Sequence, residues 1–204
     1  MITSEMITIG KDVILAIAGA ITACVAVRGL NTWARQLKGT ANFEVARKLA
    51  KATYRLRNEI ELCRAPFVRA GEYPDGYRNH GKSTAQEKGN AYGHVFANRW
   101  APVYEAIVEL DTQTLEAEAI WGSSIREKTE LLRTVARNLN AAMEAFISNE
   151  SSDGEDFRMD REFGVNIRSR VFASPSDADN LLSKELQSAI LAIEAELKPH
   201  LRRK

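Results

Sequence analysis

The feature that most constrains this chain is an uncharged run near its N-terminus, Val13–Val27, which reads VILAIAGAITACVAV. A helix of this length extends about 22 Å, whereas the hydrocarbon core of a bilayer is about 30 Å thick. The flanks can lengthen the run, because Arg28 can snorkel and Trp33 favours the membrane interface. The run therefore predicts a short transmembrane helix.

Three other interpretations of the run stay open. A cleaved signal peptide needs a basic leader, but Glu5 and Asp12 outweigh Lys11 there. A lipoprotein signal would use Ile21–Cys24, which resembles a lipobox with Cys24 as the lipidated residue, but the apolar run continues past Cys24. A buried core helix is the third, since short apolar runs commonly have that role. We favour an uncleaved anchor over all three.

The charges that flank the run predict its orientation. From Arg28 to Arg64 there are nine Lys or Arg residues against Glu44, Glu59 and Glu61, whereas the N-terminal flank has one Lys. The positive-inside rule then places the N-terminus outside and the rest of the chain in the cytoplasm. A free thiol at Cys63 agrees with a reducing compartment.

The rest of the chain carries apolar residues at helical spacing. Glu44–Phe67 has one apolar stripe, and Pro66 is expected to stop that helix. Further helices are predicted over Ala101–Ile120, Ser124–Ser148 and Ser176–Lys198. The residues expected to be buried are Val45, Leu49, Ala52, Leu56, Ile60, Cys63, Val103, Ile107, Leu110, Ile125, Leu132, Val135, Leu139, Ala142, Phe146, Leu182, Leu186, Ile190, Ile193 and Leu197.

Local signals suggest where these helices begin, bend and end. Gly39 offers a bend between the apolar run and the first body helix, and Trp121-Gly122 offers a break between the next two. Ser124 with Glu127 reads as a capping box. For the last helix, Ser174-Pro175 is a start signal and Pro199 a stop signal.

The expected fold class is all-α, with an N-terminal transmembrane helix leading into an antiparallel helical bundle. The expected domains are an anchor and juxtamembrane segment over 1–38 and a cytoplasmic bundle over 39–204. Strand-like alternation is confined to Phe163–Phe172. Two long loops are expected, over 69–90 and 149–174.

One segment, Gly76–Thr84, fits the spacing of a nucleotide-binding P-loop through Gly76, Gly81, Lys82 and Ser83. That motif works when a buried strand delivers the glycine-rich turn to a helix N-terminus, whose N–H groups hold the phosphates. The residues before Gly76 are AGEYPD, with a proline and no β-branched run. We therefore expect a polar loop between helices, with no bound nucleotide or other cofactor.

No metal site or catalytic constellation is predicted either. Asn149–Asp160 resembles a calcium loop only loosely, because Asp160 stands where a glutamate is needed, so a solvated acidic loop is expected. His80, His94 and His200 lack the spacing of a zinc site. The formal net charge of +1 gives no general attraction to nucleic acid.

The order of several segments resembles a family of uncharacterised bacterial proteins with one N-terminal transmembrane helix. These segments read RAPF, NRWAPV, LEAEAIWG and KPHLRR, and the resemblance covers most of Asn42–Arg203. It implies a bacterial origin, hence the inner (plasma) membrane, and a helical cytoplasmic domain. It assigns no catalytic residue.

Taken together, these features favour a non-enzymatic, membrane-tethered interaction module, such as a subunit, adaptor or sensor in a stress or defence system. Its expected partners are the bilayer, another protein and a further copy of the chain. Two rivals stay open. One is an enzyme that uses the 76–84 loop, with a nucleotide as substrate. The other is an effector that perturbs membranes.

Overall fold

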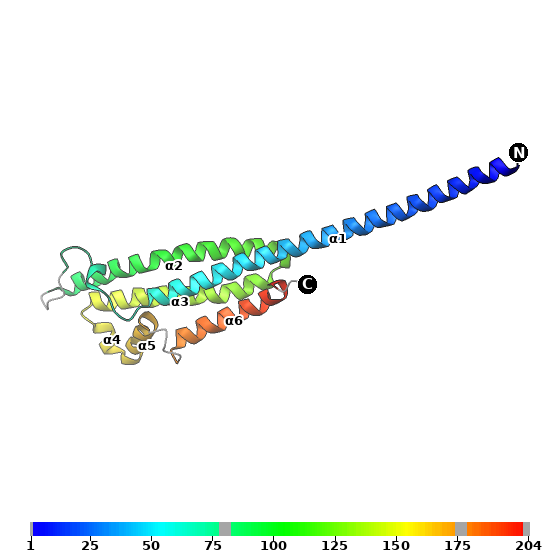
Figure 1. The fold of residues 1–204 in the computed structure, drawn as a ribbon. Coiled ribbons are helices and arrows are strands. Elements are labelled where there is room, and N and C mark those ends of the chain that lie inside the picture. Colours follow the sequence, from blue (N-terminus) through cyan, green and yellow to red (C-terminus); the bar gives the residue numbers. More distant parts are fainter. Residues whose placement is uncertain (1, 78–82, 174–178, 202–204) are drawn as a thin grey trace.

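The computed structural model describes residues 2–77, 83–173 and 179–201, with side chains from residue 15 onward except at position 16. Within these residues the chain is almost entirely helical and contains no strand, which confirms the predicted all-α class. One helix, α1, extends far beyond the packed helices (Figure 1).

The described part of the chain contains six α-helices and one 3-10 helix. Their bounds are α1 (Ile2–Cys63), the 3-10 helix η1 (Ala70–Glu72), α2 (Ala85–Trp121), α3 (Ser124–Ser151), α4 (Glu155–Met159), α5 (Arg161–Val171) and α6 (Leu181–Leu201). Helices α1, α2, α3 and α6 pack around one core, each against two of the others, and α4 and α5 cover one end of α3.

Helix α1 is 62 residues long, which corresponds to about 93 Å. Its side chains are exposed from Ile17 through Ala41, and the first buried one is Val45. By length and composition this N-terminal part is apolar enough to cross a membrane. The bend considered at Gly39 does not occur, because α1 continues through that residue without a break.

The core confirms the apolar stripes expected on all of the long helices. Leu49, Leu56, Leu132 and Leu139 are fully buried, and Cys63 is nearly so. Of the predicted core residues only Ile107 is partly exposed. Aromatic residues of α2, α3 and α4 extend this core towards the end where α4 and α5 lie, through Phe96, Phe146 and Phe157.

Helix α2 begins much earlier than predicted and shortens the expected loop over 69–90. Thr84 caps it, because its hydroxyl accepts a hydrogen bond from the Glu87 N–H at 3.2 Å and Glu87 accepts one from the Thr84 N–H at 2.8 Å. Pro102 lies inside the helix. As predicted, a break at Gly122 separates α2 from α3, where φ is +88°.

The predicted capping box at the start of α3 does not form. The cap position is Ser123, which makes no side-chain capping bond, and Ser124 instead donates to Glu196 on α6 at 3.2 Å. Helix α6 continues past Pro199 to Leu201, so that proline does not end it. The predicted start signal, Ser174-Pro175, lies outside the described residues.

The expected loop over 149–174 is also wrong, because most of it is helical. It contains the end of α3, all of α4 and all of α5, so the strand-like alternation of Phe163–Phe172 falls on a helix. Asp160 caps α5 by accepting a hydrogen bond from the Phe163 N–H at 2.9 Å. Gly164, Ile167 and Val171 form its buried face.

Candidate functional site

The P-loop-like segment lies in the connection between η1 and α2. Gly76 sits in a turn with φ at +83°, and Ser83 immediately precedes the cap of α2. Gly81 and Lys82 lie outside the described residues, as does His80. The chain reaches Gly76 from η1 and Pro74, with no strand in this described stretch. The frame that a P-loop needs is therefore replaced by a helix-to-helix connection.

A carboxylate already occupies the N-terminus of α2. Glu87 accepts the Thr84 N–H, at the helix end where a P-loop would hold phosphate. A pocket of about 420 Å³ opens beside it, and none of its described lining residues is cationic. These lining residues are Pro74, Gly76, Tyr77, Ser83, Glu87, Asn90 and Ala91. A negative charge at this point disfavours an anionic ligand.

The calcium-loop-like segment is used for internal hydrogen bonds. Asn149 is fully buried, and its side-chain oxygen accepts the Phe157 N–H at 3.0 Å. Its backbone carbonyl accepts the Gly154 N–H at 2.7 Å. Asn149 therefore fixes the turn from α3 into α4. Among the described residues, no group of three or more His, Cys, Asp or Glu side chains is arranged to hold a metal ion.

The outward side of α2 and α3 combines exposed apolar residues with arginines. Tyr104, Val108 and Leu115 are 61%, 49% and 60% exposed, and their spacing places them along one side of α2. Arg126 and Arg133 of α3 line a small pocket together with Leu115. We call this surface, defined by these five residues, the α2–α3 face.

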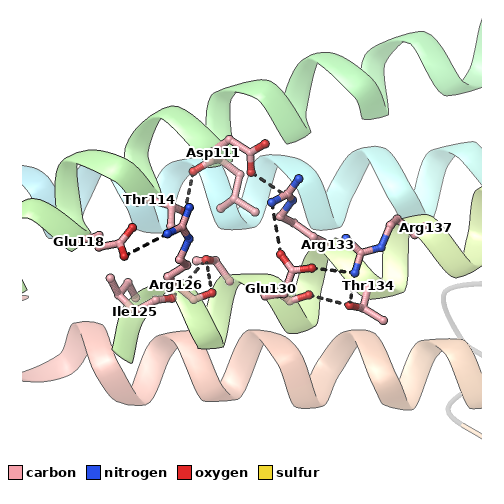
Figure 2. A network of polar contacts seen from close by, with 11 residues as sticks. Asp111, Thr114, Glu118, Ile125, Arg126, Glu130, Arg133, Thr134 and Arg137 are labelled. Atoms are coloured by element: carbon pink, nitrogen blue, oxygen red, sulfur yellow. Dashed lines mark hydrogen bonds and ion pairs between the residues drawn. The ribbon is translucent and has the colours of Figure 1, made fainter. Parts of the chain in front are cut away.

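Figure 2 shows the charged side chains that join α2 to α3 on this surface. Arg126 pairs with Glu118 at 3.4 Å, and Arg133 pairs with Asp111 at 3.3 Å. Along α3, Glu130 accepts from Arg133 at 3.2 Å and from Arg137 at 2.7 Å. Because these pairs are substantially exposed, each contributes at most about 1 kcal/mol to stability.

The pocket on the α2–α3 face is small. The pocket between Leu115, Arg126 and Arg133 holds about 150 Å³, whereas ligand sites commonly measure about 300–1,000 Å³. Tyrosine and arginine beside exposed aliphatic side chains are typical of protein interfaces. Sequence reasoning missed this surface, although the row from Tyr104 to Leu115 could have been read as a second stripe on that helix.

Two arginines have structural roles that the sequence did not reveal. Arg64 is 2% exposed and donates to the backbone carbonyls of Ser169 and Arg170 and to the side chain of Asn180. Arg99 donates to Glu72 at 2.5 Å and to backbone carbonyls in the segment after α1. Arg64 thus ties the end of α1 to α5 and α6, and Arg99 ties η1 to α2.

The titratable groups with shifted pKa values fit structural roles. Burial raises the pKa of the Cys63 thiol to about 12, so this thiol stays protonated and is a poor nucleophile at neutral pH. The hydrogen bond to Glu194 raises the pKa of Tyr54. The hydrogen bond from Arg99 lowers the pKa of Glu72. Each of these groups lies between helices or their connections, away from the α2–α3 face.

Comparisons with protein-family models, with curated proteins and with solved structures gave no match to this chain.

Proposed function

We propose that this protein is a membrane-tethered helical module that works through protein contacts. The observation that carries the proposal is the course of α1, which passes without a break from exposed apolar residues into the core. Such a helix transmits the position of its apolar segment directly to the body. The body, residues 42–201 as far as described, is then held in line with that segment.

The body is interpreted as an antiparallel bundle. Lys48 pairs with Glu116, and Arg55, further along α1, pairs with Glu109, which comes earlier on α2. Tyr54 donates to Glu194 on α6 at 2.7 Å. These partners are those that an up-and-down order of the helices would bring together.

A single span with the N-terminus outside and the body in the cytoplasm accounts best for the charges. Arg28, Arg35 and Lys38 follow the apolar run on an exposed part of α1, where anionic lipid headgroups would attract them. Together with the sequence resemblance, this arrangement supports a place in a bacterial inner membrane. A role as subunit, adaptor or sensor follows from that architecture.

The α2–α3 face is the proposed contact surface, and site-specific photo-cross-linking tests it. A photoreactive amino acid at Leu115 is expected to attach to another protein in native membranes. The matched control is Leu191, a similarly exposed leucine on α6. Adducts at Leu115 and none at Leu191 support the proposal. Equal labelling at the two positions, or adducts with lipid alone, contradicts it.

A further inference from the structure

We infer that two copies of this chain pair in parallel along α1, through one heptad seam that runs from the membrane segment into residues 28–41. This inference rests on the proposed membrane anchor and names a second copy as one partner. Residues 28–41 are called the stalk. They form about 21 Å of helix with every side chain exposed, before Asn42 accepts a hydrogen bond from Trp121 of the body.

The stalk presents large apolar side chains at coiled-coil spacing. Leu30, Trp33 and Leu37 are 64%, 60% and 50% exposed and occupy positions a, d and a of a heptad. Thr40 follows at d. These side chains are exposed on an unbroken helix, so a partner that covers this row would bury apolar surface and stabilise the pair.

The charges on the stalk favour a second copy as that partner. Arg28 and Arg35 occupy position f, directly opposite the seam, and Lys38 occupies position b. The positions that flank the seam are uncharged, namely Gly29 and Gln36 at g and Ala34 and Ala41 at e. Two identical stalks can therefore meet along their seams without bringing like charges together.

The same register continues into the apolar segment with a change of residue size. In the apolar segment, the a and d positions are Gly19, Ala23 and Ala26. The larger residues of that segment lie outside these positions, namely Leu15, Ile17, Ile21 and Val25. Small residues at the seam allow close packing of helices in lipid, where burial of large apolar groups gives no advantage. Past Arg28 the seam passes through the interface, where Trp33 is favoured, and then reaches water, where burial of a large apolar side chain such as Leu37 is favourable. The change in residue size along the seam thus follows the change of surroundings along α1.

Membrane anchoring also selects the orientation of the pair. Two copies that insert in the same direction bring equal positions of α1 to the same depth. Leu30 then faces Leu30 and Leu37 faces Leu37 of the second copy, which gives a parallel pair in register. The two Arg35 side chains lie on opposite outer sides, about 20 Å apart, because each helix is about 10 Å wide.

Cysteine cross-linking of the full-length chain in native membranes tests the inference. The background is Cys24→Ser, and Cys63 is buried and does not interfere. Leu30→Cys, Leu37→Cys and Thr40→Cys are expected to give covalent dimers on oxidation. Arg35→Cys, at the outward position of the same stalk, is the matched control, and its dimer yield should be at least tenfold lower.

The outcomes separate this inference from the proposed function. One outcome is a chain in the membrane fraction whose Leu37→Cys variant stays monomeric or dimerises no more than Arg35→Cys. That result contradicts pairing along the seam and leaves the proposed membrane anchor intact. The same monomeric result is expected if lipid or another protein covers the stalk. If the chain is absent from the membrane fraction, the anchor and the seam both fail.

Discussion

Arg64 shows how a single buried cation can fix the relation between distant segments. Its guanidinium donates to carbonyls at 2.6 Å and 3.2 Å and to Asn180 at 2.7 Å, on segments more than a hundred residues away in sequence. A lysine keeps the charge but lacks the planar fork that reaches several acceptors at once. The buried acceptors would then lose their donors.

We therefore expect Arg64→Lys to lower the free energy of unfolding by about 1–3 kcal/mol. The control is Arg47→Lys on the same helix, where an exposed arginine pairs with Glu44 and the change should stay within about 0.5 kcal/mol. Chemical denaturation of the full chain in detergent measures both. Equal changes in the free energy of unfolding for the two variants would show that the hydrogen bonds of Arg64 do not stabilise the fold.

The buried leucines of the core are expected to contribute strongly to stability. Leu56 and Leu139 are fully buried, so truncation of either to alanine should lower the free energy of unfolding by about 2–5 kcal/mol. Leu191→Ala, on the exposed side of α6, should change it little. An unchanged denaturation midpoint for both core variants would contradict the packing described here.

Glu72 gives a prediction about pH. The hydrogen bond from Arg99 lowers the pKa of Glu72 below its usual value of 4.5 in the folded chain. The charged carboxylate therefore stabilises the fold at neutral pH, and this contribution is lost as the pH falls below about 4.5.

Glu72→Gln should consequently lower the denaturation midpoint at pH 7, and the difference from wild type should shrink towards pH 3. Glu155→Gln, an exposed carboxylate on α4, serves as the control with no such difference at either pH. A difference between Glu72→Gln and wild type that grows on acidification would contradict the assigned sign.

Core residues could be predicted from the sequence, whereas the hydrogen bonds of the two arginines Arg64 and Arg99 could not. Leu49, Leu132 and Ile190 follow the helical repeat, which is a local property of the sequence. Arg64 and Arg99 each donate to at least two backbone carbonyls, and every residue type carries a carbonyl. Residue types alone therefore could not indicate these partners.

At the scale of helices, α5 illustrates two competing patterns. Phe163–Phe172 shows strand-like alternation, but Gly164, Ile167 and Val171 also repeat at helical spacing. The helical pattern prevails because the side of α5 that carries Gly164, Ile167 and Val171 packs on the buried Phe157 and on α3. On the other side, Val165 is 63% exposed. Tertiary packing, which the sequence does not display, decided between the two patterns.

Close packing of α2 against the end of α3 requires a glycine. A Cβ atom at Gly89 would lie 2.8 Å from the Cβ of Ser151, too close without movement of the helices. At Gly93, one turn further along, a Cβ would meet nothing within 4 Å. The two glycines thus form a matched pair on one helix.

Gly89→Ala should therefore lower the free energy of unfolding by about 1–3 kcal/mol through overpacking. Gly93→Ala should raise it by about 0.5–1 kcal/mol, because alanine is the better helix former. Thermal or chemical denaturation of the two variants side by side measures the difference. A stabilising Gly89→Ala would show that α2 and α3 lie further apart than described.

For the whole molecule, the unbroken α1 joins an exposed apolar segment to the packed helices. The exposed apolar residues, the stalk and the core residues between Val45 and Cys63 belong to one helix. Its apolar run and the basic flank after Val27 could be recognised in the sequence. Its continuity through Gly39 could not, because a lone glycine permits both a bend and a straight helix.

The proposed topology, with the body in the cytoplasm, is tested by finding the side of the membrane on which the body lies. A reporter enzyme that is active only outside the cytoplasm is fused after Lys204, and a matched fusion carries a reporter that fluoresces only inside. We expect the first fusion to be silent and the second to be bright. Strong activity of the first fusion, with no fluorescence from the second, would contradict an N-terminal anchor that holds the body in the cytoplasm.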